Sequence, residues 1–239
     1  MSERRDELAG ALDTVRQRIE RAVADAGRTD RPTLVVVTKH FPRADVDHLV
    51  ALGVQDIGEN RLQEATAKTD DGGDPPPAVR RHFVGQVQSK KAGAVAAWAD
   101  VVHSVDRAKL VGALARGAER AGRELTVLLQ VDLDEQPGTG GAAGGRGGAA
   151  PDEVPALADE VVAAGPLRLG GVMAVAPREG DPEEAFARLA EVSAALRAQH
   201  PDATWVSAGM SGDLEAAIRH GATHLRVGSA ILGSRPSHR

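Results

Sequence analysis

Cysteine is absent from this sequence of 239 residues. Its absence excludes disulfides, thiolate metal ligands and thiol nucleophiles. Tyrosine is absent as well, and aromatic residues make up only 2% of the chain, so platforms on which nucleic-acid bases could stack are poorly supplied. The formal net charge of −5 leaves no excess of basic residues to follow a phosphate backbone. We therefore expect no nucleic-acid partner.

Long apolar runs are missing too. No stretch approaches the ~20 uncharged apolar residues that cross a bilayer. Residues 1–27 mix charged and apolar residues at helical spacing, which differs from the unbroken apolar segment of a signal peptide. We therefore expect a cytoplasmic protein that does not associate with a membrane.

Short β-branched apolar runs alternate with amphipathic segments along the whole chain, after an opening segment of helical spacing. The predicted strands are 33–38, 54–57, 82–85, 101–104, 125–132, 167–173, 204–207 and 223–227. The predicted helices between them are 43–52, 60–69, 89–98, 106–121, 152–164, 182–199 and 211–220. Regular alternation of this kind is typical of a parallel sheet with helical crossovers.

The number of predicted strands favours an α/β fold of the (β/α)8 TIM-barrel type with an extra N-terminal helix, forming a single domain over residues 1–239. An open, doubly wound sheet is the alternative, but no Gly-x-Gly-x-x-Gly motif follows the first strand. Residues 68–80 are rich in glycine and proline, and residues 135–151 are rich in glycine and alanine. Both segments are predicted to be surface loops of the barrel.

A lysine directly follows the first predicted strand, in the sequence LVVVTKHFP, although lysine is scarce here, with five against 24 arginines. In a barrel, residues at the carboxyl ends of the strands carry the chemistry, which makes Lys39 a candidate. Apolar surroundings would disfavour its ammonium form and lower its pKa, and a neutral amine can form a Schiff base with an aldehyde. The alternative is a lysine at a strand end that extends its charged head into solvent.

Small and hydroxylated residues follow the last two predicted strands, in the sequences WVSAGMSGDL and LRVGSAIL. Barrels often bind phosphate with these two loops, where glycine lets the backbone approach the anion and serine adds a donor. The candidates are Ser207, Gly209, Ser211, Gly228 and Ser229. Alternatively, Ser211 caps the helix that follows, assisted by Asp213 in its first turn.

A lysine for an aldehyde and a cradle for a phosphate suggest one ligand that carries both groups, pyridoxal 5′-phosphate (PLP). With these features, the whole chain resembles the pyridoxal phosphate homeostasis protein family, whose members are single-domain barrels similar to the N-terminal domain of alanine racemase. The matching stretches lie between about residues 5 and 235. They are VVVTKHFP, IGENRLQEA, HFVGQVQSKK, VHSVDRAKL, LLQVDL, LGGVMAV and SAGMSGDLEAAIRHGATHLRVGSAILGSR.

The resemblance implies roles for particular residues. It implies that Lys39 forms the internal aldimine with PLP and that Arg226 faces the pyridine nitrogen of the ring. The other residues that it assigns to the cofactor are Asn60 and Met173 beside the ring, Ser207, Ser211, Gly228 and Ser229 around the phosphate, and Met210 within the same motif.

Each of these residues also has an ordinary structural interpretation. Asn60 could be a helix N-cap, with Gln63 three residues further on. Met173 could be a core methionine, and Arg226 could form a surface ion pair. His82, which opens the third predicted strand, is interpreted as a polar strand-end residue rather than a general base. No histidine pair has metal-ligand spacing on a predicted helix, and we expect no metal.

The arginine assigned to the ring nitrogen bears on the activity. A permanently cationic guanidinium disfavours protonation of that nitrogen, so stabilisation of a carbanion by the ring would be weak. The resemblance therefore predicts a protein that holds PLP, buffers the aldehyde and delivers it to PLP-dependent apoenzymes, without catalytic turnover. The alternatives are an amino-acid racemase and a Schiff-base aldolase that acts on a phosphorylated substrate. Racemisation on this barrel type uses a tyrosine from a second domain, and this sequence contains no tyrosine.

The sequence departs from the family pattern at three positions. Arg61 stands where a tyrosine is common, Lys90 replaces an asparagine, and Arg146 stands where the loop after the fifth strand normally carries a lysine. An arginine cannot form an aldimine at neutral pH, so a secondary transfer site on that loop would be missing here. The family resemblance also suggests a monomer.

Overall fold

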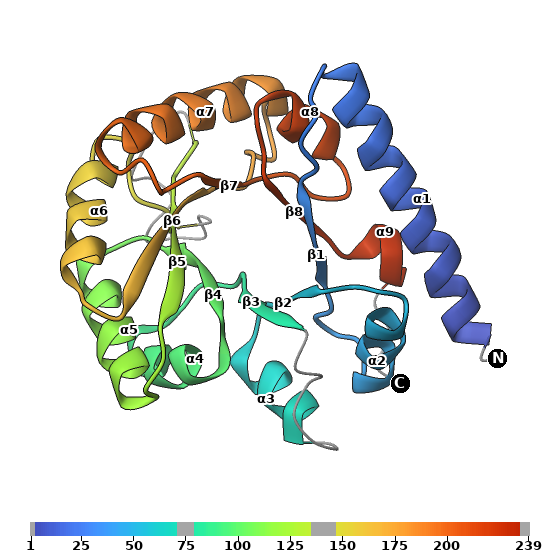
Figure 1. Cartoon of the computed structure of the whole chain (residues 1–239), viewed down its shortest axis with the longest axis horizontal. Helices are drawn as coiled ribbons and strands as arrows, with labels where there is room; N and C mark the ends of the chain where they lie inside the picture. The colour runs from blue at the N-terminus through green and yellow to red at the C-terminus, as the bar shows by residue number, and fades with distance from the viewer. Residues whose placement is uncertain (1–2, 71–78, 135–146, 235–239) are drawn as a thin grey trace.

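Short strands rich in β-branched and apolar residues form the centre of the computed structural model. It describes residues 3–70, 79–134 and 147–234, and within them eight parallel strands form a closed barrel in sequence order. The strands, at the centre of Figure 1, are β1 (Thr33–Val37), β2 (Asp56–Glu59), β3 (Arg80–Phe83), β4 (Val101–Val105), β5 (Leu125–Gln130), β6 (Leu167–Met173), β7 (Trp205–Ser207) and β8 (His224–Val227). The prediction of a TIM barrel with an extra N-terminal helix is confirmed.

Closure of the barrel depends on the pairing of the first strand with the last. β1 pairs with β8 in the register Val35 to Arg226, and with β2 in the register Val37 to Gly58. Because side chains alternate along a strand, every second residue faces the barrel interior. A Cβ atom on Gly58 would lie 3.2 Å from Val35 and 3.3 Å from the Val37 side chain, so the glycine keeps the interior free of a clash.

Helices surround the barrel as an outer layer (Figure 1). They are α2 (Arg43–Ala51), α3 (Leu62–Asp70), the short 3-10 helix η1 (Ser89–Lys91), α4 (Ala92–Trp98), α5 (Ala108–Arg120), α6 (Val154–Ala163), α7 (Pro182–Gln199), α8 (Leu214–Arg219) and α9 (Ser229–Leu232). The additional helix α1 (Glu3–Asp25) packs across α2, α8 and α9.

The apolar stripe of α1 explains this position. Leu8, Leu12, Val15 and Ile19 recur at helical spacing and are buried against the outer layer. Full burial of each such side chain contributes about 1.5–3 kcal/mol relative to an exposed position. Arg4 and Arg18 extend the contact with polar groups, because Arg4 donates to Asp45 (2.8 Å) on α2 and Arg18 donates to Glu215 (2.7 Å) on α8.

Several predicted boundaries were wrong by two residues or more. β2 spans 56–59 instead of 54–57. β3 spans 80–83 instead of 82–85, because it begins with two arginines that resemble a polar loop. Arg80 lies 3.5 Å from Asp56, and the Arg81 backbone N–H donates to Asp100 (2.7 Å), so charged partners stabilise this strand start. The predicted helix 89–98 consists of η1 followed by α4, and the predicted helix 211–220 is shortened to α8.

The predicted loops at 68–80 and 135–151 lie partly outside the described residues. Their described ends are more ordered than predicted, since α3 continues to Asp70 and Ala149 bridges to Val131 beside β5. The helix α9 was not predicted. Its four residues follow Gly228 directly and are too short to show helical periodicity.

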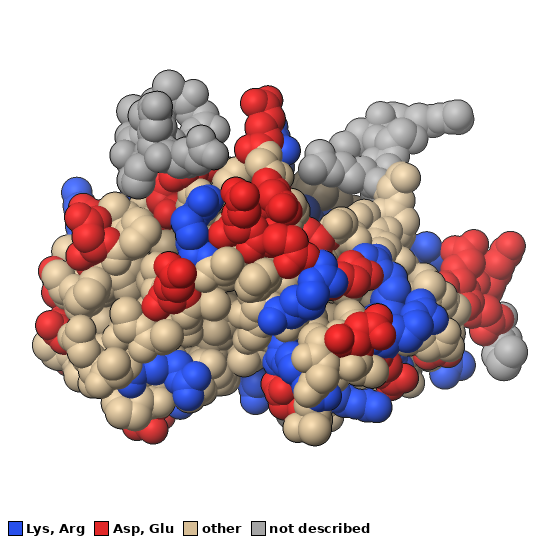
Figure 2. Space-filling view, turned by 90° about the horizontal axis from the view of Figure 1, so that it is seen from above, with Lys and Arg blue, Asp and Glu red and all other residues tan. Residues whose placement is uncertain are grey.

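Charged side chains of both signs are interspersed on the face of the molecule shown in Figure 2. Among the described residues, no helix combines the length and the apolar character needed to cross a membrane.

Candidate functional site

The carboxyl ends of β8, β1 and β2 lie side by side, and they bring the candidate residues together. The registers Val36 to Val227 and Val37 to Gly58 fix these neighbours. Continued past the strand ends, the two registers place Lys39 level with Asn60 on one side and with the segment that follows Gly228 on the other. The carboxyl ends of barrel strands form the usual active-site face of this fold.

The turn that carries Lys39 is fixed by α3. β1 ends at Val37, so Lys39 lies two residues beyond the strand rather than within it, and its side chain is partly buried. Lys68 Nζ donates to the carbonyl oxygen of Thr38 (2.7 Å), and the backbone N–H of His40 donates to Glu64 (3.1 Å). His40 has a φ of 70°, an unusual value for a residue other than glycine. Contacts with α3 therefore hold the lysine turn in place.

A buried acid anchors the same turn from below. Glu59 at the end of β2 is 1% exposed and accepts from Lys68 and from the Thr38 hydroxyl (2.6 Å). Burial raises the pKa of Glu59, an effect that Lys68 and Thr38 oppose. Its Oε2 atom has no hydrogen-bond partner among the described residues. The Lys68 amine therefore has a structural role, because it binds Glu59 and the Thr38 carbonyl oxygen.

The loops after β7 and β8 meet at two serines. The hydroxyls of Ser211 and Ser229 lie 3.3 Å apart, and the Ser211 Oγ accepts from the backbone N–H of Ala230 (3.4 Å). A Cβ atom on Gly228 would lie 3.0 Å from the Val37 carbonyl oxygen, so only a glycine lets this loop approach β1 closely. The serine hydroxyls and a glycine-lined backbone provide the donors and the space that a phosphate group requires.

Two features of the β7 loop shape this pocket. Gly209 has a φ of 88°, and a Cβ there would lie 2.7 Å from the side chain of Ala217. Met210 is 37% exposed, and its backbone N–H donates to Asp213 (2.6 Å). The alternative interpretation of Ser211 as the cap of the following helix is wrong, because α8 begins at Leu214 and its N-cap position is Asp213.

Arg226 lies inside the barrel, which excludes its interpretation as a surface ion pair. It is 6% exposed, and its guanidinium donates to the Ser207 hydroxyl (2.6 Å) and to the carbonyl oxygen of Ala174 (2.8 Å). Burial lowers the pKa of Arg226 to about 10, while Asp213 opposes this change. The guanidinium thus remains cationic at neutral pH, and Ser207 faces the interior rather than the two other serines.

Met173 and Asn60 occupy opposite sides of the barrel mouth. Met173 ends β6, is 2% exposed and is level with Ser207 in the sheet. Asn60 is partly buried, and a Cβ on Gly85 would lie 2.1 Å from the Asn60 carbonyl oxygen, so the β3 loop packs tightly on it. The N-cap interpretation of Asn60 is wrong, because α3 starts at Leu62 and the residue before it is Arg61.

A buried polar chain in the barrel interior was not predicted. His82 lies within β3, is fully buried, and places its Nε2 2.9 Å from Asp56 Oδ1 and its Nδ1 2.8 Å from His103 Nε2. His103 Nδ1 lies 2.9 Å from the Ser207 hydroxyl. Burial lowers the pKa of His82, although Asp56 opposes it, and lowers the pKa of His103 well below its usual value. Both rings are therefore neutral at neutral pH.

Alternation along the strands could have revealed this chain. Residues two positions apart on a strand point to the same face. In VVHSV and THLRV a polar residue shares its face with another residue that points into the barrel, which predicts polar side chains in the barrel interior. The interpretation of His82 as a strand-end residue did not consider which face of the strand it occupies. The partners of each group come from strands far apart in the sequence, so their contacts required the structure.

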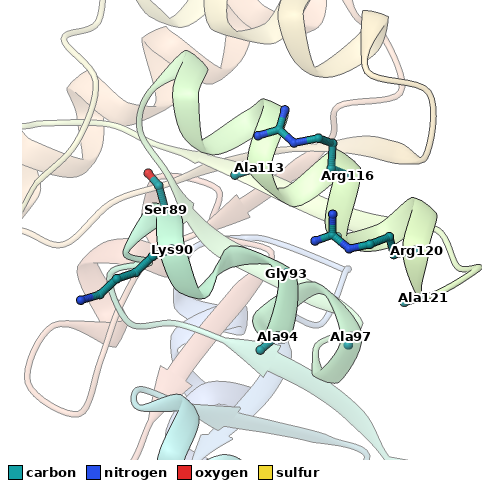
Figure 3. A pocket seen from close by; sticks show the side chains of 10 residues that line it. Ser89, Lys90, Gly93, Ala94, Ala97, Ala113, Arg116, Arg120 and Ala121 are labelled. Carbon is teal, nitrogen blue, oxygen red and sulfur yellow. The ribbon is translucent and has the colours of Figure 1, made fainter.

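Two surface pockets lie near the remaining sequence candidates. One of about 270 Å³ at the mouth is lined in part by Asn60, Arg61 and Lys91. Another of about 490 Å³ lies on the outer wall between η1, α4 and α5, where Arg116 and Arg120 reach across from α5 (Figure 3) and Lys90 contributes to the lining. Arg146 lies outside the described residues. In the described part of the chain, no group of three or more acidic or histidine side chains could hold a metal ion.

The closed barrel and the candidate residues at its carboxyl face place the protein among the alanine racemase-like barrels. Residues 11–236 match the family model of the alanine racemase N-terminal domain. Alanine racemase from Corynebacterium glutamicum shares the fold with a TM-score of 0.70 at 14% identity, over 97% of this chain and 62% of that one. At this identity the likeness shows the fold alone.

Closer relatives narrow the class. The pyridoxal phosphate homeostasis protein of Mycobacterium tuberculosis H37Rv is 40% identical over 98% of this chain and 95% of the relative. The structure of PipY from Synechococcus elongatus PCC7942 with PLP bound has a TM-score of 0.80 at 30% identity, over 95% of this chain and 100% of that one. The chain belongs to the pyridoxal phosphate homeostasis protein family.

Proposed function

We propose that this protein binds PLP at the carboxyl face of the barrel and serves PLP homeostasis by holding and releasing the cofactor. The observation that carries the proposal is the convergence of three groups on one mouth. These are the Lys39 turn, the Ser211 and Ser229 hydroxyls 3.3 Å apart, and the buried Arg226 guanidinium. The relatives named for this role and the PLP complex of PipY support it.

Each part of the site suits a part of the ligand. The Lys39 amine would bond to the aldehyde carbon with loss of one water molecule, which is a reversible reaction suited to storage and release. Ser211, Ser229 and the backbone at Gly228 would hold the phosphate. Asn60 and Met173 would flank the ring, and Met210 would cover the site from the β7 loop.

The fit of the site to PLP is supported by the structure of its cradle. Gly228 approaches the Val37 carbonyl oxygen so closely that a Cβ there would lie at 3.0 Å, and Gly209 is held at a positive φ. Both glycines lie in the loops that carry the two serine hydroxyls. Such a cradle suits a phosphate ester, which needs several donors at short range.

A role without catalytic turnover is the form of the proposal that the ring environment favours. Arg226 would present N–H donors to the pyridine nitrogen and offers no acceptor for a pyridinium proton, which would keep the nitrogen unprotonated. The ring then withdraws electrons weakly, which disfavours racemisation. The sequence also contains no tyrosine that could act as a second base. An alanine racemisation assay of the loaded protein tests this point, with no turnover expected.

Borohydride reduction followed by peptide mass spectrometry tests the site itself. The expected result is a pyridoxyl adduct on Lys39, absent from Lys39→Ala and unchanged in Lys109→Ala, a control at an exposed lysine of α5. An adduct spread over several lysines, or a protein that gains no visible absorption with PLP, contradicts the proposal. An aldolase acting on a phosphorylated sugar would instead give an adduct with that sugar.

Transfer to apoenzymes and assembly are further parts of the proposal. We propose that the chain acts as a single-domain monomer and that it passes PLP to apoenzymes whose own lysines bind the cofactor more tightly. Light scattering after size-exclusion chromatography tests the monomer. Recovery of activity by a PLP-dependent apoenzyme mixed with the loaded protein tests the delivery, with free PLP scavenged from solution.

A further inference from the structure

The buried polar chain described above runs from one edge of the barrel to the other. Asp56 is the first residue of β2, at the amino edge, while Arg226 lies near the carboxyl end of β8. Between them stand His82, His103 and Ser207, each fully buried. Successive polar atoms lie 2.9, 2.8, 2.9 and 2.6 Å apart, so every link is a hydrogen bond.

The chemistry of the two ends decides the direction of every bond. The Asp56 carboxylate, 3.5 Å from the Arg80 guanidinium, can only accept, so His82 must carry its proton on Nε2. His82 Nδ1 is then an acceptor, which requires the proton of neutral His103 to be on Nε2. His103 Nδ1 is then also an acceptor.

The remaining links follow in the same sense. Ser207 must donate its hydroxyl proton to His103 Nδ1, which leaves the Ser207 oxygen to accept from Arg226, a group that can only donate. The five groups therefore form one directed chain of donors from the guanidinium to the carboxylate. The reverse order would leave the Ser207 proton without an acceptor in this chain, because Arg226 has none to offer.

We propose that Asp56, His82 and His103 are positioning residues for the cofactor site, which hold the Ser207 oxygen as an acceptor and so fix the Arg226 guanidinium at the barrel mouth. The inference rests on the proposed function in one respect, namely that Arg226 faces the ring of PLP. Its consequence is that a carboxylate at the opposite edge of the barrel affects how the cofactor is held.

The geometry also explains why a chain is used here. Arg226 is buried, and within the described part of the chain no carboxylate forms an ion pair with it. A guanidinium in such a place needs acceptors that fix its orientation. The Ala174 carbonyl supplies one acceptor, and the chain supplies the other by keeping the Ser207 hydroxyl hydrogen turned toward His103.

The first test concerns the chain without any ligand. Long-range ¹H–¹⁵N NMR correlations of the histidine rings, recorded at pH 7 on the PLP-free protein, report the tautomer of each ring. The expected result is a neutral ring with the proton on Nε2 for both His82 and His103. A proton on Nδ1 of His103, or a charged ring at either position, would overturn the directed chain.

The second test concerns the effect on the cofactor. The amide of Asp56→Asn can donate as well as accept, so the direction of the chain is no longer fixed at its Asp56 end. We therefore expect a shift of the visible absorption of bound PLP and an about three- to tenfold rise in its dissociation constant. Asp45→Asn is the matched control. Asp45 is a buried carboxylate like Asp56 but binds Arg4 where α1 packs on α2, outside the barrel interior, so its loss should leave PLP affinity and absorption unchanged.

The outcomes separate the two proposals. A wild-type protein that does not bind PLP contradicts the proposed function, while the ring tautomers still test the chain. PLP binding that is identical in wild type and Asp56→Asn, in affinity and in spectrum, overturns the positioning role and leaves the proposed function intact. If Asp56→Asn does not fold, His103→Gln serves as the second variant, with the same shift in absorption expected.

Discussion

The Arg226 guanidinium donates to the Ser207 hydroxyl across 2.6 Å inside the barrel, where Ser207 is fully buried and Arg226 is 6% exposed. The same guanidinium donates to the Ala174 carbonyl, so it joins β8 to β7 and to the end of β6. A buried cation that bridges three neighbouring strands contributes to stability as well as to the site. Its removal leaves acceptors without partners in the interior.

Arg226→Lys tests this bridging role. A lysine retains the charge but lacks the planar fork that reaches both acceptors, so we expect the free energy of unfolding to fall by about 1–3 kcal/mol. Urea unfolding followed by the two tryptophans measures the loss. Ser207→Ala keeps the Ala174 bond and should cost less than Arg226→Lys. Equal stability of Arg226→Lys and wild type would contradict the bridge.

The sequence was sufficient to predict the barrel because strand and helix periods alternate clearly along the chain. Boundaries failed where tertiary contacts override local preference. Arg80 and Arg81 open β3 because Asp56 and Asp100 lie beside them, which a polar pair in the sequence does not reveal. The helix α9 escaped prediction because four residues cannot show a period.

The site could be predicted in part for a related reason. Lys39, Ser211 and Ser229 follow strands, and the barrel rule brings strand ends together. Two details depended on contacts between distant segments. Ser207 turns inward to Arg226 and His103, and Lys68 anchors the lysine turn through Thr38. The local sequence around these residues predicts neither contact.

Buried neutral histidines should make the protein less stable in acid. Burial lowers the pKa of His82 and His103, and lowers that of His224 to about 3. An unfolded histidine has a pKa of about 6.5, so the unfolded state takes up protons below that pH while the folded state does not. Stability is therefore complete above about pH 6.5 and falls as the pH decreases toward 3.

The size of this acid effect can be measured for one residue. At ~1.4 kcal/mol per pKa unit, His224 alone should reduce the free energy of unfolding by about 2 kcal/mol between pH 6.5 and pH 5. Urea unfolding at several pH values gives the slope, which His224→Gln should reduce. Ser89→Ala, which removes a neutral hydroxyl from η1, is the control for substitution itself and should not change it. A slope that is the same in His224→Gln and wild type would contradict the assignment.

Lys68→Met should destabilise the protein through a buried acid. Glu59 is 1% exposed, and Lys68 is its cationic partner, so the variant leaves an uncompensated carboxylate and costs about 3 kcal/mol. Adding Glu59→Gln should recover part of this loss. Arg31→Met is the control, because the Arg31 to Glu20 pair is exposed and contributes less than about 1 kcal/mol. Equal losses for Lys68→Met and Arg31→Met would refute the buried anchor.

Ser211→Ala tests the phosphate cradle of the proposed function. The Ser211 hydroxyl lies 3.3 Å from that of Ser229 and 3.4 Å from the Ala230 nitrogen, at the point where the loops after β7 and β8 meet. A hydrogen bond to a charged phosphate is stronger than one between neutral groups, so its loss should weaken PLP binding about tenfold. Fluorescence titration with PLP measures the change.

The control for this variant separates a specific loss from a general one. Ser89→Ala removes a hydroxyl at the start of η1, on the groove of the outer wall, and should leave PLP affinity unchanged. Pyridoxal without its phosphate should bind equally to Ser211→Ala and to wild type, because the missing donor would have no anion to contact. If Ser211→Ala weakens pyridoxal as much as PLP, the hydroxyl supports the loop rather than the phosphate, and the cradle must lie elsewhere on the mouth.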